Sequence, residues 1–235
     1  MTKLLVSVRD AAEARLAVDA GVDLIDVKEP LAGPLGAATP SVVAEIAALV
    51  AGARPLSMAL GELQDFDPAQ VPRVPDIRFA KLGLSRCAGR CDWPGRWQQA
   101  LTALPADVAP VAVVYADNQR ARSPAARPIL TQAVRLECRA ILVDTFDKTA
   151  GGLLDCWSME QIEWFIVTAH AEGLLAVVAG GLTLGSFGRI LPLQPDYVAV
   201  RGAACNAGRE GQMSADRLVE LVAIVGRSEQ ACRET

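Results

Sequence analysis

Apolar residues gather in eight short runs along the chain, and turn-forming residues bound each run. Most of the runs are continuously apolar rather than alternating, which is typical of parallel strands covered on both faces. The pattern therefore predicts eight buried strands in a parallel sheet. Their expected ranges are Leu4–Val8, Asp23–Val27, Pro55–Leu60, Ile77–Leu82, Pro110–Tyr115, Ala140–Val143, Leu174–Ala179 and Tyr197–Val200.

Helical spacing of apolar residues fills most of the intervals between these strands. Asp10 and Ser158 are favourable N-caps, each followed three residues later by a glutamate or glutamine that completes a capping box. Between residues 60 and 77, prolines at three positions permit at most one turn of helix. The predicted helices are Asp10–Ala20, Thr39–Ala51, Trp93–Leu104, Pro124–Glu137, Ser158–Ala171, Thr183–Leu191 and Ser214–Val225.

Eight strands alternating with helices in 235 residues match an α/β fold, the (β/α)8 TIM barrel, which typically needs about 250 residues. The alternative is an open doubly wound sheet that binds a nucleotide. That fold needs glycines after its first strand, where this chain has Ser7-Val8-Arg9-Asp10, and the chain contains no P-loop motif. No repeat or linker divides the sequence, so we expect one barrel domain spanning residues 1–235.

Composition excludes several classes of partner. The chain has 23 basic and 27 acidic residues, a net charge of −4, and no basic run that could follow a phosphate backbone. Nucleic acid is therefore not an expected partner. The longest uncharged stretch, residues 173–188, is shorter than the ~20 apolar residues of a membrane helix. With no secretory signal in view, we expect a cytoplasmic protein that does not bind membranes.

Six cysteines are scattered along the chain without the Cys-x-x-Cys spacing of redox or zinc sites. The only histidine, His170, falls in a predicted helix and has no cysteine beside it. We therefore expect free thiols and no metal ion. The cysteines are Cys87, Cys91, Cys138, Cys156, Cys205 and Cys232.

The lysine positions are informative because the chain uses arginine for most of its positive charge. Only four of the 23 basic residues are lysines. Lys28 and Lys81 lie at the ends of two predicted strands, and Lys148 follows a third strand by a few residues. Because the carboxyl ends of barrel strands carry the active site, we expect these three lysines at the functional face of the barrel.

Clustered lysines favour covalent chemistry on a carbonyl group. Burial or a second nearby cation lowers the pKa of a lysine, so that its neutral amine can attack a carbonyl carbon. Asp26 lies two residues before Lys28 on the same face of its strand, and Asp144 ends a strand in a similar position. Either carboxylate could pair with a lysine or transfer protons. The alternative is that these lysines are solvated loop residues, with Asp147 as a surface partner of Lys148.

Small residues follow the last two predicted strands. Gly180 and Gly181 come after the seventh strand, and Arg201, Gly202 and Ala203 come after the eighth. Such loops expose backbone N–H groups where barrels frequently bind phosphate, and Arg201 would add positive charge. The pattern predicts a phosphorylated substrate, while ordinary tight turns are the alternative explanation for the same residues.

Five segments carry a family resemblance. They are Asp-Val-Lys-Glu-Pro at 26–30, Gly-Pro-Leu-Gly-Ala at 33–37, Lys-Leu-Gly-Leu at 81–84, Val-Asp-Thr at 143–145 and Val-Arg-Gly-Ala-Ala-Cys at 200–205. Together they resemble the (5-formylfuran-3-yl)methyl phosphate synthases, over nearly the whole chain. The resemblance implies a TIM barrel that condenses two molecules of glyceraldehyde 3-phosphate with loss of phosphate and water, in methanofuran biosynthesis. It also implies that neither a metal ion nor an organic cofactor takes part.

The resemblance implies a role for each residue that matches a family motif. Lys28 would be the Schiff-base lysine and Lys81 the acid/base lysine, with Asp26 and Asp144 tuning them. Lys148 would match the family's third lysine, and its role stays open. We hypothesise that Lys28 forms an imine with one triose phosphate. Lys81 would then move a proton, so that an enamine attacks the aldehyde of the second triose.

Two other functions remain open at this point. A Schiff-base aldolase or isomerase acting on another sugar phosphate would use the same residues. A barrel that only binds a phosphorylated ligand would use them without turnover. A reaction of two trioses also needs a second phosphate site, which we place in the loop at residues 33–39, and we expect the protein to form a homo-oligomer.

Overall fold

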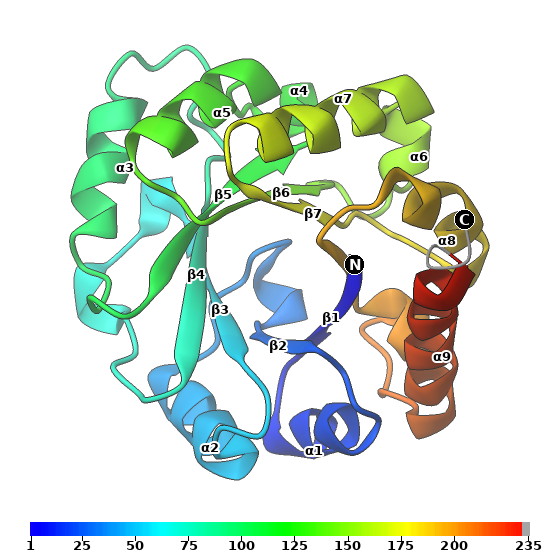
Figure 1. The fold of residues 1–235 in the computed structure, drawn as a ribbon. Coiled ribbons are helices and arrows are strands. Elements are labelled where there is room, and N and C mark those ends of the chain that lie inside the picture. Colours follow the sequence, from blue (N-terminus) through cyan, green and yellow to red (C-terminus); the bar gives the residue numbers. More distant parts are fainter. Residues whose placement is uncertain (232–235) are drawn as a thin grey trace.

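Eight parallel strands close into one barrel, which confirms the fold expected from the sequence (Figure 1). The computed structural model describes residues 1–231. Each strand pairs with its neighbours in sequence, and β8 returns to pair with β1. The strands are β1 (Lys3–Val8), β2 (Leu24–Val27), β3 (Leu56–Glu62), β4 (Ile77–Gly83), β5 (Ala109–Tyr115), β6 (Ala140–Asp144), β7 (Leu175–Val178) and β8 (Tyr197–Val200).

Helices surround the barrel (Figure 1), and all seven predicted helices are present. The predicted caps are confirmed, since the side chains of Asp10 and Ser158 accept hydrogen bonds from the backbone N–H groups three residues later. None of the described helices has both the length and the apolar composition needed to span a membrane. The seven are α1 (Ala11–Asp19), α2 (Pro40–Val50), α3 (Trp93–Leu101), α5 (Ala126–Arg135), α7 (Met159–Ala171), α8 (Leu184–Ile190) and α9 (Ala215–Ala231).

Several short elements were not predicted. Segments of three or four residues carry no periodic pattern that a sequence reading could detect. In the stretch that we expected to be a loop, β3 continues to Glu62 and two single 3-10 turns follow it. The short elements are η1 (Pro30–Ala32), η2 (Leu63–Asp65), η3 (Pro68–Gln70), α4 (Asn118–Ala121), α6 (Leu153–Cys156), η4 (Leu191–Leu193), η5 (Gly202–Ala204) and β9 (Asn206–Arg209).

Alternate residues of each strand point into the barrel and fill it in layers. Near the starts of the strands the filling is apolar and includes Leu5 and Leu24. Two residues further along, the strand register places Ser7 beside Asp26 and Asp26 beside Ser57. Polar groups therefore replace apolar ones inside the carboxyl end of the barrel.

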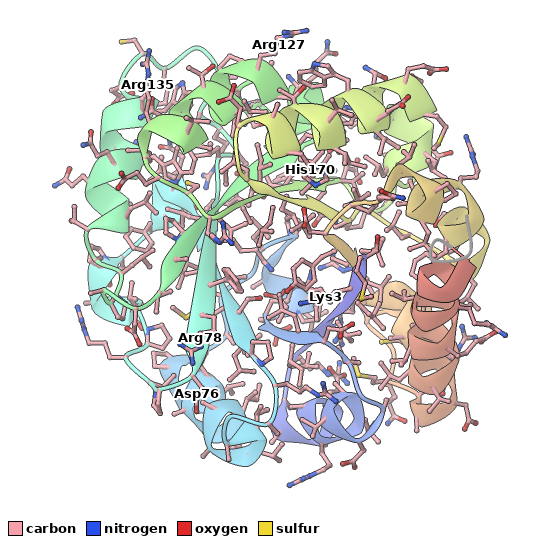
Figure 2. All side chains as sticks on the ribbon, viewed as in Figure 1. Lys3, Asp76, Arg78, Arg127, Arg135 and His170 are labelled. Atoms are coloured by element: carbon pink, nitrogen blue, oxygen red, sulfur yellow. The ribbon has the colours of Figure 1, made fainter. Side chains whose placement is uncertain are left out.

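The starts of the strands form the opposite end of the barrel from this polar layer. The residues that Figure 2 labels there include Lys3 at the start of β1, Arg78 near the start of β4 and His170 near the end of α7. The His170 ring is hydrogen-bonded to Asp196 through Nε2 at 2.8 Å. The only histidine of the chain is therefore far from the polar layer.

A buried ion pair attaches the end of β8 to the first helix. The guanidinium of Arg201 donates to both carboxylate oxygens of Glu13, at 2.7 and 3.1 Å. It also donates to the backbone carbonyl of Ser7 at 3.0 Å. Because both charges are buried, the pair stabilises the fold only while both partners are present.

We expect Glu13→Ala to lower the free energy of unfolding by about 3–5 kcal/mol, because the variant leaves the Arg201 guanidinium buried without a counter-charge. Urea denaturation followed by circular dichroism measures the loss. The matched control is Asp92→Ala, which breaks the exposed pair between Arg90 and Asp92 and should leave the unfolding midpoint unchanged. A Glu13→Ala protein as stable as this control would contradict the prediction.

Candidate active site

A cavity of about 540 Å³ opens at the carboxyl ends of the strands. All ten site residues proposed from the sequence line it, and they come from the ends of β2, β4, β6, β7 and β8. They are Asp26, Lys28, Lys81, Asp144, Lys148, Gly180, Gly181, Arg201, Gly202 and Ala203. The fold therefore gathers these groups in one place, as expected for a barrel enzyme.

Lys28 is the amine best prepared for nucleophilic attack. Burial lowers the pKa of Lys28 to about 8, and the carboxylates of Asp144 and Asp26 only partly oppose that effect. Its Nζ lies 3.5 Å from the carbonyl oxygen of Pro34 and, within residues 1–231, forms no ion pair. A substantial fraction of Lys28 is therefore a neutral amine at mildly alkaline pH.

Asp26 is the centre of a buried hydrogen-bond network inside the barrel. Its Oδ1 accepts from Lys81 Nζ and from Ser57 Oγ, each at 2.5 Å, and its Oδ2 accepts from Ser7 Oγ at 3.0 Å. Lys81 is also buried, so this ion pair is shielded from solvent. The Lys81 ammonium lies within electrostatic range of Lys28. Both side chains line the cavity, so Lys81 is a candidate proton donor or acceptor for a molecule bound to Lys28.

A second lysine–aspartate pair lies at the end of β6. Lys148 Nζ donates to Asp144 Oδ1 at 2.5 Å, and the backbone N–H of Thr145 donates to the same oxygen at 2.8 Å. Burial tends to raise the pKa of Asp144, but Lys148 and Lys28 hold it below its usual value. Asp144 is therefore an anion at neutral pH. Lys148 lines the cavity with Asp144 and does not form the surface pair with Asp147 that the sequence left open.

Two glycines after β7 let the chain pass close to the cavity wall. Gly180 and Gly181 have φ angles of +99° and +62°, a region that other residues rarely adopt. A Cβ at Gly180 would lie 3.2 Å from atoms of Thr145 and Leu153, so a larger residue would displace its neighbours. Both glycines line the cavity, so backbone atoms form this part of its wall.

Arg201 lines the cavity but does not provide the free positive charge expected from the sequence. Its guanidinium is balanced by Glu13, and its Nε donates to the backbone carbonyl of Arg209 at 2.6 Å. The physical reason is that Arg201 is buried at a strand end, and a buried charge requires a counter-charge. Arg201 therefore holds the segment after β8 in place.

Four further residues of the site were not found from the sequence. Ser7 and Ser57 bind Asp26, and Arg209 and Arg217 line the cavity. The inward positions of the two serines, in register with Asp26, could have revealed them. Arg209 lies in β9 and Arg217 in the first turn of α9, outside the strand ends on which the sequence analysis relied.

Within residues 1–231, no three histidine, cysteine or acidic side chains lie close enough together to hold a metal ion. The five cysteines in this range are free thiols. Burial raises the pKa of Cys205, which follows β8, so its sulfur is a protonated thiol rather than a reactive thiolate. Cys232 lies outside the described residues.

Comparison with known protein families finds relatives along nearly the whole chain. The family model described as 4-HFC-P synthase matches residues 4–222. A Methanococcus maripaludis (strain C5) protein named (5-formylfuran-3-yl)methyl phosphate synthase is 31% identical over 232 residues, covering 94% of this chain and 98% of that protein. A protein of the same name from Methanopyrus kandleri is 33% identical over 215 residues, covering 88% of this chain and 90% of that protein.

The barrel is also similar to solved structures. Phosphoribosyl anthranilate isomerase from Thermus thermophilus matches it with a TM-score of 0.66 and 17% sequence identity. The match covers 96% of this chain and 99% of that chain. At such low identity the likeness shows the fold alone.

The pKa of about 8 predicts the pH at which Lys28 reacts with aldehydes. Below pH 8 the protonated amine is unreactive, and above pH 8 the neutral amine predominates, so the rate of alkylation should rise with a midpoint near pH 8. Reductive alkylation with formaldehyde and cyanoborohydride, followed by peptide mapping, measures this rate. Exposed Lys3, at the other end of the barrel (Figure 2), is the internal reference. A Lys28 profile that follows an ordinary ammonium group, with a pKa of about 10.4, would contradict the prediction.

Proposed function

The chain belongs to the 4-HFC-P synthase family, and we propose that it forms (5-formylfuran-3-yl)methyl phosphate from glyceraldehyde 3-phosphate through a Schiff base on Lys28. Its relatives are named as synthases, so the protein is an enzyme. The observation that carries the proposed mechanism is the low pKa of Lys28, in a cavity that also holds two lysine–aspartate pairs. We place the product in methanofuran biosynthesis.

The proposed reaction balances without an oxidant or a reductant. Two triose phosphates give one furan phosphate, one inorganic phosphate and two molecules of water. Every step is a proton transfer, an addition or an elimination, which amines and carboxylates can catalyse. The proposal therefore uses no metal ion and no organic cofactor.

The first steps of the proposed mechanism take place on Lys28. Its neutral amine attacks the aldehyde of one triose phosphate, and water leaves as the imine forms. The imine acidifies the proton on the adjacent carbon. Removal of this proton gives an enamine, which expels the phosphate from the third carbon. What remains on Lys28 is a three-carbon iminium whose terminal enol carbon is a nucleophile.

The position of the substituents on the product decides which carbon this enol attacks. Attack on the aldehyde carbon of the second triose would place the phosphomethyl group next to the ring oxygen. Attack on the ketone carbon of its isomer places that group at position 3 of the furan, as the name of the relatives' product requires. We therefore replace the aldehyde expected from the sequence with its ketone isomer, dihydroxyacetone phosphate. Transfer of a proton from carbon 2 to carbon 1 of glyceraldehyde 3-phosphate through an enediol forms this ketone, and we assign that step to the pair of Lys28 and Lys81. Ring closure, loss of two water molecules and hydrolysis of the imine then release the product.

The two lysine–aspartate pairs supply the proton transfers in this scheme. Lys81, held by Asp26 inside the barrel, serves the carbon next to the imine. Lys148, held by Asp144 at the mouth, donates protons to the oxygen atoms that leave as phosphate and water. The negative charge of Asp144 also acts on Lys28, so it stabilises the positive charge of the imine. The glycine-lined wall after β7 is the proposed seat of the first substrate's phosphate.

Incubation with glyceraldehyde 3-phosphate tests the proposal directly. One half of the mixture is reduced with borohydride for intact mass and peptide mapping, and the other half is examined for the ultraviolet absorbance and the mass of the furan. We expect a reduced triose adduct on the Lys28 peptide together with the furan product. An adduct without furan would favour a Schiff-base aldolase or isomerase. The absence of both would overturn the proposal.

Substitution of the lysines should separate the steps. Lys28→Arg keeps the positive charge but has no neutral amine, so both the adduct and the furan should disappear. The Lys81→Met variant should still form the borohydride-trapped triose adduct on Lys28. It should form furan about 10²–10⁴ times more slowly, because a proton-transfer group is lost. Arg135→Gln, an exposed change at the opposite end of the barrel (Figure 2), is the matched control and should keep the wild-type rate. Furan formation by Lys28→Arg would exclude the Schiff base.

A further inference from the structure

Arg209 reaches the cavity from outside the barrel strands. It is the last residue of β9, and its backbone carbonyl accepts a hydrogen bond from Arg201 Nε at 2.6 Å. Arg201 is itself held by Glu13, so the backbone of Arg209 is linked through Arg201 to helix α1. The side chain of Arg209 lines the cavity.

Within residues 1–231, only one nitrogen of the Arg209 guanidinium donates hydrogen bonds. Its Nη2 donates to the carbonyl oxygens of Pro30 at 2.6 Å and Gly33 at 3.0 Å, in the segment after β2. A guanidinium has five N–H groups. Among residues 1–231, no hydrogen-bond acceptor is found for the other three, on Nε and Nη1. These three N–H groups remain for a molecule bound in the cavity.

The cavity holds more positive charge than its carboxylates balance. Three of its six lysines and arginines form ion pairs with an aspartate or a glutamate. Within the described residues, Lys28, Arg209 and Arg217 have no carboxylate in an ion pair with them. Lys28 must be neutral to react, so the two arginines are the cations available to an anionic ligand.

Arg209 also lies near the reacting amine. Burial lowers the pKa of Arg209, and the carboxylate of Asp144 opposes that effect. Arg209 Nη2 donates to the carbonyl oxygen of Gly33 at 3.0 Å, and Lys28 Nζ lies 3.5 Å from the carbonyl oxygen of the next residue, Pro34, so both side chains contact the same short segment. A guanidinium keeps its charge at any physiological pH. An anion held by Arg209 would therefore lie beside Lys28.

We propose that Arg209 binds the phosphate of the second triose and places the carbonyl carbon of that triose against the adduct on Lys28. The planar guanidinium matches two oxygens of a phosphate, which a lysine cannot do. The inference rests on the proposed function, because a reaction of two trioses requires two phosphate subsites. It moves the second subsite from the loop at residues 33–39 to the arginine that holds the first residue of that loop.

Glycerol 3-phosphate tests the subsite without any reaction, because it has the phosphate and the three carbons of the substrates but no carbonyl group. Calorimetric titration should show two sites per chain in the wild type and one in Arg209→Gln. Arg209→Lys keeps the charge but not the planar fork, so it should keep the second site with about tenfold weaker affinity. Arg135→Gln is the control for loss of a surface arginine and should keep both sites.

The site that remains in Arg209→Gln shows in the same titration that the barrel is intact. Two sites in Arg209→Gln would overturn the proposal, and so would a single site in the wild type. Loss of both sites in Arg209→Gln would also overturn it, because the effect would not be confined to the second subsite. Two sites in the wild type and one in Arg209→Gln would support it.

Turnover separates this inference from the proposed function. Arg209→Gln should need about tenfold more glyceraldehyde 3-phosphate for half-maximal furan formation, while borohydride trapping on Lys28 stays unchanged. If the wild type binds two molecules of glycerol 3-phosphate but forms no furan, the synthase proposal fails and the Arg209 subsite stands. If Arg209→Gln reaches half-maximal furan formation at the same glyceraldehyde 3-phosphate concentration as the wild type, the subsite fails and the synthase stands.

Discussion

Three ammonium groups in the mouth of the barrel share two carboxylates, and the reactivity of the site depends on this imbalance. Asp26 holds Lys81 and Asp144 holds Lys148, each at 2.5 Å. Lys28 lies between these pairs with a backbone carbonyl as its nearest partner. In water such an amine would stay protonated, but here loss of solvent outweighs the attraction of the two aspartates. Lys28 therefore has a pKa of about 8 and a reactive fraction of neutral amine.

The strand register of the barrel maintains this arrangement. Ser7, Asp26 and Ser57 lie side by side on β1, β2 and β3, so the hydrogen bonds to Asp26 follow from the pairing of the strands. A slip of one residue in β2 would turn both Asp26 and Lys28 away from the interior. Burial opposes such a slip, because the same shift would place the Asp26 carboxylate in the apolar core between strands and helices, without its serine partners. The strand register therefore determines both the stability of the core and the geometry of the site.

Much of this site could be predicted from the sequence because most of its residues lie at the ends of strands. Continuous apolar runs located the eight strands, and the scarcity of lysine drew attention to Lys28, Lys81 and Lys148. The balance of charge at Arg201 could not be predicted, since its partner Glu13 lies in a helix 188 residues away. Arg209 could not be predicted either, because a four-residue strand outside the barrel carries no pattern that points toward the cavity. Contacts between segments distant in sequence are known only once the barrel has closed.

The barrel closes where β8 pairs with β1, beside the ion pair of Glu13 and Arg201, and this has a consequence for the chain during its synthesis. β1 is synthesised before the other strands of the barrel, yet its second partner is β8, the last of them. A chain still on the ribosome without β8 already contains Lys28, Lys81 and Lys148, but β1 has an open edge and Glu13 lacks the Arg201 guanidinium. The enclosed cavity, and with it the desolvation that deprotonates Lys28, belongs to the finished chain. Unfinished chains therefore lack the enclosed site in which a lysine would capture cellular aldehydes.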